Sequence, residues 1–189
     1  APDIRIDGFI LPGHVSTVIG RQAFEFIGRD YGMCAVVAGF EPVDILGAVY
    51  LLLSRVLGGQ PGVCNAYTRV VREEGNPRAR ELMSGVFAPE DARWRGFGDI
   101  PGSGLGLRKE YEEYDAERRF DVAVPASGPP NGCACGEVLR GKMVPPGCAL
   151  YGNACTPNHP VGPCMVSSEG ACAAYYRYGY GEEGIPVGQ

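Results

Sequence analysis

Apolar and polar positions in the first part of the chain follow two different periods. Residues 4–11 read as a strand that ends at Pro12-Gly13. The apolar positions that follow recur at the spacing of a helix until Gly32 provides a stop signal. These positions are Val15, Val18, Ile19, Ala23, Phe26 and Ile27. The pattern therefore predicts a strand followed by a helix.

The same order of elements repeats along the chain. Residues 34–40 form a short continuous apolar run, which is typical of a strand buried on both faces. Pro42 then begins a second helix, which ends at Gly58-Gly59. The apolar residues that share one side of this helix are Ile45, Leu46, Val49, Leu53, Val56 and Leu57.

A third strand and a third helix follow. The strand is predicted at residues 66–71. Asn76 as the N-cap and Pro77 as the first helical residue then begin a helix. Its apolar residues are Leu82, Met83, Val86 and Phe87. Alternating strands and helices predict βαβ units and therefore a parallel sheet.

The pattern changes after this region. Residues 88–107 fit neither period, residues 108–120 predict a charged surface helix, and residues 125–132 (PASGPPNG) have the composition of a linker. The predicted fold class is α/β. A small parallel-sheet, three-layer domain spans residues 1–130, and a loop-rich, partly helical, cysteine-rich subdomain spans residues 131–189.

Composition and charge limit the possible partners. A content of 45% hydrophobic and 21% charged residues is that of a soluble globular protein. A net charge of -5 without a basic run argues against a nucleic-acid partner. The most apolar stretch, residues 45–57, is too short to span a membrane, and no leader pattern is recognised. We therefore expect a cytoplasmic location, where clustered cysteines are more often metal ligands or catalytic thiols than structural disulfides.

Polar residues follow the predicted strands. The carboxyl ends of parallel strands meet at one edge, where ligands bind. His14, with Ser16 and Thr17, follows the first strand, Glu41 follows the second, and residues 72–76 follow the third. Each has an ordinary structural alternative, as an N-cap, a carboxylate at a helix N-terminus or a solvated loop. Together they form a candidate cleft in which His14 can act as acid, base or ligand.

Cysteine is concentrated in the last third of the chain. Six of the eight cysteines lie there, in glycine- and proline-rich sequence: Cys133, Cys135, Cys148, Cys155, Cys164 and Cys172. A segment with so few apolar runs cannot offset the entropy of ordering it, so coordination or disulfides must hold it. Zinc fits less well, because its usual half-site spacings do not occur. An iron-sulfur cluster needs four thiolates, which leaves two for a redox dithiol or for simple burial.

Six motifs carry a resemblance to a known family over essentially the whole chain. They are PGHVSTVIG at 12–20, GFEP at 39–42, EGNP at 74–77, IPGSG at 100–104, CGEVLRG at 135–141 and CMVSSEGAC at 164–172. In these motifs the chain resembles the C-terminal half of the HypD family of hydrogenase-maturation proteins. The resemblance implies assembly of the iron centre of nickel-iron hydrogenases. It also implies a transient iron carrying cyanide and carbon monoxide ligands, and, as partners, the small chaperone HypC and other maturation proteins.

The resemblance also implies roles for individual residues. The family's cluster pattern, Cys-x14-Cys-x6-Cys-x16-Cys, falls on Cys133, Cys148, Cys155 and Cys172, which by this resemblance ligate a [4Fe-4S] cluster. Cys135 and Cys164 match the extra pair that in some members resembles the redox disulfide of ferredoxin:thioredoxin reductase. Within the first class of function described below, we expect His14, Glu41 and Glu169 to face a cleft shared with the other half of the protein.

Two classes of function follow from these expectations. The N-terminal half of HypD proteins, with its Cys-Gly-Gly-His motif, has no counterpart in this sequence, so we expect the chain to be a truncated member of the family or one piece of such a protein. In the first class it is an iron-sulfur redox and scaffold component of an assembly factor, with dithiol chemistry. In the second it is a non-catalytic partner-binding module whose tail is a structural zinc or disulfide clamp. Cys34 and Cys64 match no motif and are expected to be buried or incidental thiols.

Overall fold

The computed structural model describes residues 6–94, 96–120 and 132–179. Within these ranges the chain divides into two compact units. The first, the α/β unit, spans residues 6–87, and the second, the cysteine unit, contains the described residues from 88 onward. Residues 125–131 of the predicted linker, and with them the predicted domain boundary, lie outside the described residues.

The α/β unit is built on a parallel sheet of three strands in the order β1-β2-β3. The strands are β1 (Gly8–Pro12), β2 (Cys34–Ala38) and β3 (Gly62–Asn65). In the register, Val36 at the centre of β2 lies between Ile10 and Cys64. Every residue of β2 is buried, because the central strand is covered on both faces, as its continuous apolar run predicts.

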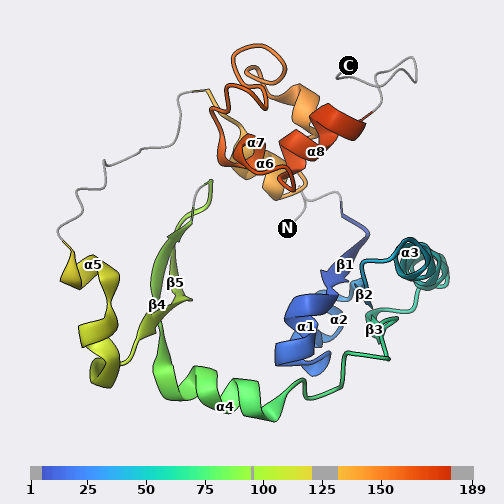
Figure 1. Ribbon diagram of the computed structural model, residues 1–189. Coiled ribbons are helices and arrows are strands. Elements are labelled where there is room, and N and C mark those ends of the chain that lie inside the picture. Colours follow the sequence, from blue (N-terminus) through green and yellow to red (C-terminus); the bar gives the residue numbers. More distant parts are fainter. Residues whose placement is uncertain (1–5, 95, 121–131, 180–189) are drawn as a thin grey trace. The chain divides into compact units, whose positions relative to one another are not determined.

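Helices cover both faces of this sheet (Figure 1). They are α1 (Gly13–Ile19), α2 (Phe26–Tyr31) and α3 (Pro42–Leu57). On one face Ile27 of α2 shares a buried cluster with Val37, and on the other Ala48 of α3 shares a buried cluster with Val36. Neighbouring residues of a strand point to opposite faces. The unit therefore has three layers, and the predicted α/β class with a small parallel sheet is confirmed.

The helix α3 has the predicted bounds, but its apolar residues are not confined to the buried side. Ala48, Leu51 and Leu52 lie in the cluster against the sheet. On the apolar side indicated by the sequence, Leu46 is 70% exposed and Leu57 is 87% exposed. Because the helix is apolar on nearly all sides, the hydrophobic pattern predicts that it forms but not which face it buries.

The third strand lies earlier in the chain than predicted. The sequence indicates residues 66–71, whereas β3 ends at Asn65. The Asn65 side chain accepts a hydrogen bond from the backbone of Tyr67 (2.9 Å) and donates one to the carbonyl of Val71 (2.8 Å). These two bonds hold the following residues in a loop. The loop returns Val71 to the core, where it is 3% exposed, which explains its strand-like pattern.

The single helix predicted before Gly32 is also wrong, because three short helical segments occupy this region: α1, a 3-10 helix η1 (Gln22–Phe24) and α2. At the end of α1 the chain lies against a segment that is distant in sequence, residues 72–76. There the backbone N–H of Asn76 donates to the carbonyl of Val18 (3.0 Å), and that of Arg21 donates to the carbonyl of Arg72 (3.2 Å). Contacts distant in sequence therefore end α1, and local periodicity cannot predict them.

The same crossing leads into α4 (Pro77–Val86). The Asn76 side chain accepts a hydrogen bond from the backbone of Ala79 (3.1 Å), and Pro77 occupies the first helical position. Both features follow the sequence prediction, because an N-cap side chain and a proline at this position satisfy or remove free N–H groups.

The cysteine unit begins with a two-stranded sheet, β4 (Phe87–Trp94) and β5 (Gly98–Leu107). The surface helix predicted at residues 108–120 is wrong. A 3-10 helix η2 (Lys109–Tyr114) and a short helix α5 (Ala116–Arg119) take its place. Between them Asp115 is extended and accepts a hydrogen bond from the backbone of Glu117 (3.0 Å). This local cap interrupts what would be one helix.

The tail of the cysteine unit is loop-rich and partly helical, as predicted. Its helical segments are α6 (Cys135–Leu139), η3 (Pro145–Gly147), α7 (Pro163–Val166) and α8 (Ala171–Tyr178). Among the helices of the described ranges, none combines the length and the apolar content required to cross a bilayer.

Candidate functional site

The tail cysteines form the core of the cysteine unit. Cys135, Cys155, Cys164 and Cys172 belong to one buried cluster, Cys133 packs against it, and Cys148 is 8% exposed. These cysteines come from separate segments: Cys135 begins α6, Cys148 follows η3, Cys164 lies in α7 and Cys172 in α8. The short segments of the tail thus pack around sulfur atoms.

Three of the thiols are joined by hydrogen bonds. The Cys164 thiol donates to Cys172 Sγ at 3.1 Å, and Cys135 donates in turn to Cys164. Burial, followed by these bonds, raises the pKa of Cys135 and of Cys164 to about 11. Cys172 is the final acceptor of this chain, so of the three it is the one whose thiolate the hydrogen bonds favour.

Cys133 and Cys172 each lie within electrostatic reach of the other two predicted cluster ligands. Burial raises the pKa of Cys133 and of Cys172, and the charges of thiolates at Cys135, Cys148 and Cys155 would raise both further. Several buried thiolates are unstable together unless positive charge compensates them. A metal cation supplies that charge and deprotonates its thiol ligands. The chemistry of this donor set therefore fits a metal-thiolate centre.

The backbone approaches two of these sulfurs. The N–H of Val161 donates to Cys155 Sγ at 3.3 Å. At Gly162 a Cβ atom would collide with Cys133 Sγ, so the backbone passes close to this sulfur. Backbone N–H groups directed at cysteine sulfur are a usual feature of iron-sulfur sites, where they tune the reduction potential.

Tyr151 places an unpaired hydroxyl beside the cysteines. Its Oη is buried and has no hydrogen-bond partner within the described part of the chain. Burial, and then the charge of a Cys172 thiolate, raises the pKa of Tyr151 to about 12. A buried donor without a partner costs about 1–3 kcal/mol. An additional acceptor at this position, such as the sulfur of a bound cluster, would satisfy it.

No site for a single metal ion is preformed in the part of the chain that the structure describes. Across residues 6–94, 96–120 and 132–179, no three His, Cys, Asp or Glu side chains are placed to hold one metal ion. The ligands of a zinc ion converge on a single point. In a [4Fe-4S] cluster each thiolate binds a different iron, so its ligands are spread over the cluster. The [4Fe-4S] cluster on Cys133, Cys148, Cys155 and Cys172 stays a prediction.

A second group of polar residues lies at the carboxyl edge of the sheet in the α/β unit. His14 follows β1 and Glu41 follows β2, and the His14 ring lies 5.2 Å from the ring of Phe40. The predicted meeting of these strand ends is therefore observed. Glu169 belongs to the cysteine unit, where it is exposed in the turn between α7 and α8.

The structure adds three residues to this edge that the sequence did not indicate. Arg69 pairs with Glu41 (2.8 Å) and donates to both carboxylate oxygens of Asp44. Its guanidinium also lies 4.5 Å from the centre of the Tyr67 ring. The sequence prediction missed Arg69 and Tyr67 because it placed them inside a strand at residues 66–71. Only residues in the loops after the strands were considered for the sheet edge. Asp44, in the first turn after Pro42, reads as an ordinary helix-terminus carboxylate.

Two hydroxyls near this edge have structural roles. Ser16 Oγ donates to the carbonyl of Pro12 (2.8 Å), and Thr17 Oγ1 donates to that of Gly13 (2.9 Å). These bonds lie within the first turns of α1, so the alternative of an N-cap is wrong and no catalytic role is needed to explain either residue.

The carboxylate pair with Arg69 predicts a pH dependence. The pKa of Asp44 is held at about 2, below its ordinary value of 3.8, first by hydrogen bonds from Arg69 and then by those with Glu41. A carboxylate with a lowered pKa stabilises the fold above its unfolded pKa, and this stability is lost as the pH falls through the folded pKa. We expect the stability advantage of the wild type over Asp44→Asn to be constant above about pH 5 and to disappear between about pH 4 and pH 2. Urea unfolding followed by circular dichroism measures the difference in unfolding free energy between the two proteins. An equal difference at pH values of about 5 and about 2 would contradict the lowered pKa of Asp44.

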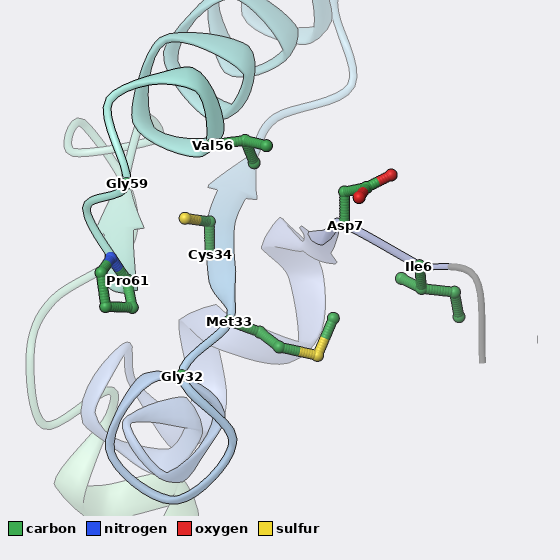
Figure 2. A pocket seen from close by; sticks show the side chains of 8 residues that line it. All are labelled: Ile6, Asp7, Gly32, Met33, Cys34, Val56, Gly59 and Pro61. Carbon is green, nitrogen blue, oxygen red and sulfur yellow. The ribbon is translucent and has the colours of Figure 1, made fainter. Parts of the chain in front are cut away.

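A pocket of ≈ 220 Å³ lies at the opposite, amino-terminal edge of the sheet (Figure 2). Cys34 lines it and is 5% exposed. Figure 2 shows its side chain pointing toward Pro61 and away from Asp7. The thiol donates to the carbonyl of Gln60 (3.3 Å). We interpret Cys34 as a structural thiol, consistent with its absence from every motif.

Comparison with known proteins finds relatives along nearly the whole chain. A family model named HypD, with the description "Hydrogenase formation hypA family", matches residues 1–179. The chain is 46% identical over 186 residues to the hydrogenase maturation factor HypD2 of Bradyrhizobium diazoefficiens. It is 47% identical over 183 residues to the hydrogenase maturation factor HypD of Rhodobacter capsulatus. These alignments cover 95% and 94% of this chain but 49% and 48% of the relatives. The chain therefore spans about half the length of the curated relatives it matches.

Proposed function

The chain belongs to the HypD family, and from this premise we propose that it is the iron-sulfur redox and scaffold part of a hydrogenase maturation factor. In this proposal Cys133, Cys148, Cys155 and Cys172 hold a [4Fe-4S] cluster. The observation that carries it is the closeness of Cys133 and of Cys172 to Cys148 and Cys155, because thiols this close and this buried would need a cation to ionise together. The unpaired hydroxyl of Tyr151 provides independent support for an acceptor bound beside Cys172.

The remaining two tail cysteines are proposed to form a redox dithiol. When bound, the cluster supplies electrons one at a time, whereas a dithiol is oxidised to a disulfide by loss of two. Cys135 and Cys164 are hydrogen-bonded to each other, and Cys164 is in turn bonded to the proposed ligand Cys172. This contact supports a dithiol directly beside the cluster. The raised pKa of both thiols keeps them protonated at neutral pH, so that the reduced form is neutral in the buried site.

The wider reaction is also a proposal, because this chain covers about half of its relatives. We propose that a transient iron carrying cyanide and carbon monoxide ligands is the cargo, held with the other half of the protein and a HypC-like chaperone. His14 and Glu41 at the sheet edge, and Glu169 in the cysteine unit, would face this cargo. Other hydrogenase maturation proteins are the expected partners, and the cytoplasm is the expected compartment.

Iron and sulfide analysis of the chain purified without oxygen tests the proposal. We expect a brown protein with about four irons and four sulfides per chain and an absorption band at about 400 nm. A colourless protein with one zinc per chain would instead support the partner-binding module with a zinc clamp. A protein without metal or free tail thiols would support a disulfide-clamped tail.

A further inference from the structure

We propose that the cluster-free tail forms a disulfide between Cys164 and Cys172, which removes one cluster ligand from use until it is reduced. The inference rests on the proposed function in one respect, because Cys172 is a ligand of the proposed cluster. The pairing differs from that of Cys135 with Cys164, and Cys164 is the member common to both.

The distance between the two sulfur atoms supports this pairing. Cys164 Sγ and Cys172 Sγ are 3.1 Å apart, and each residue is only 6% exposed. A disulfide bond is about 2.0 Å long, so its formation requires the two sulfur atoms to approach each other by about 1 Å.

The backbone holds the two cysteines in this position. Cys164 lies in α7, and Cys172 is the second residue of α8. Gly170 immediately precedes α8, and a Cβ atom there would collide with the carbonyl oxygen of Cys164. Its N–H also donates to the carbonyl of Ser167 (3.0 Å). The turn thus brings the start of α8 against α7, and the short distance follows from the fold.

The oxidation is balanced with a hydroperoxide as the oxidant. Cys172, which lies 3.1 Å from Cys164 Sγ, loses its thiol proton to solvent and attacks one oxygen of hydrogen peroxide as the thiolate. The O–O bond breaks, a sulfenic acid forms, and hydroxide leaves and takes up a proton to become water. Cys164 sulfur then attacks the sulfenic sulfur, the S–O bond breaks, and the thiol proton leaves with the hydroxyl group as a second water. Two thiols lose two electrons, the peroxide gains them, and a dithiol reductant reverses the step.

Cluster insertion then determines the partner of Cys164. When Cys172 binds iron, the thiol that remains beside Cys164 is Cys135, which is also hydrogen-bonded to it. When the cluster is absent, Cys172 is available at 3.1 Å. The same cysteine thus belongs to the redox dithiol in the loaded protein and to a protective disulfide in the cluster-free protein.

Peptide mapping of the full chain provides the direct test. The chain is freed of iron with a chelator, treated with hydrogen peroxide, alkylated and cleaved after glutamate. Cleavage after Glu137 and Glu169 places Cys164 in the fragment 138–169 and Cys172 in the fragment that follows it. We expect a disulfide between these two fragments, assigned to Cys164 by tandem mass spectrometry, and its loss in Cys172→Ser but not in Cys135→Ser. A link from Cys164 to the fragment that contains Cys135, or no disulfide at Cys164, would overturn the inference.

Iron uptake separates this inference from the proposed function. We expect the peroxide-treated wild type to take up about tenfold less iron than the reduced wild type during cluster reconstitution. Cys164→Ser, treated identically, should take up as much as its reduced form, whereas Cys135→Ser should behave like the wild type. If the mapped disulfide forms but the reduced wild type never binds iron, the proposed function fails and the disulfide stands. If iron binds equally well with the disulfide intact, the inferred block of cluster insertion is wrong.

Discussion

Replacing Cys148 with alanine is expected to reduce the iron content of the anaerobic protein from about four atoms per chain to fewer than one. Cys148 is 8% exposed, so water does not readily replace its sulfur. If Cys148 is a ligand of the proposed cluster, its loss would leave one iron without a protein ligand, and the remaining ligand thiolates would lose part of the positive charge that compensates them. Cys135→Ala should retain the iron, because Cys135 belongs to the dithiol in the proposed assignment. Iron and sulfide analysis with the absorption at about 400 nm measures both results.

A matched control for this experiment lies in the other unit. Cys64→Ala makes the same chemical change at a partly buried cysteine that packs in the α/β unit against Val36 and Ala48. The iron content of Cys64→Ala should equal that of the wild type. That result would show that losing a cysteine does not by itself lower the iron content. If Cys148→Ala and Cys135→Ala lost iron equally, the division of the six tail cysteines into four ligands and one redox pair would be wrong.

The composition of the tail predicts its character, because a segment without apolar runs must be held by something other than a core. The structure places four of the tail cysteines in one buried cluster together with Val138, Met165 and Ala173. The prediction that coordination or disulfides hold the tail stays a prediction. The sequence could not indicate the unpaired hydroxyl of Tyr151 or the 3.1 Å contact between Cys164 and Cys172. Both depend on how α7, α8 and the preceding loop pack, and neither changes the spacing of the cysteines along the chain.

The α/β unit shows the same limit of sequence prediction. The central strand β2 was predictable, because burial on both faces leaves a continuous apolar run. The position of β3 was not, because the Asn65 side chain bonds the following residues into a loop with a strand-like pattern. At the sheet edge, His14 and Glu41 follow from topology. The position of Arg69 at this edge does not follow from topology, because it depends on the loop after Asn65.

The second large effect is expected at Gly75, where the two distant segments cross. Its φ is +73°, a conformation that other residues rarely adopt. A Cβ atom at this position would lie 2.5 Å from the backbone nitrogen of Gly20 and would also collide with the carbonyl oxygen of Val18. Backbone atoms cannot move aside as a flexible side chain can. We expect Gly75→Ala to reduce the unfolding free energy of the α/β unit by roughly 2–4 kcal/mol.

Hydrogen exchange of peptides from β2 measures this loss within the α/β unit alone, because the fully buried central strand exchanges only when the unit opens. Gly47→Ala is the matched control. Gly47 lies within α3, and a Cβ atom there would meet nothing within 4 Å. The same substitution should therefore stabilise the unit by about 0.5–1 kcal/mol, since alanine loses less entropy than glycine in a helix. A lower stability of Gly75→Ala together with a higher stability of Gly47→Ala would show that the crossing of residues 18–20 with Gly75 requires glycine. Equal protection of β2 from exchange in Gly75→Ala and in the wild type would mean that the crossing does not hold this unit together.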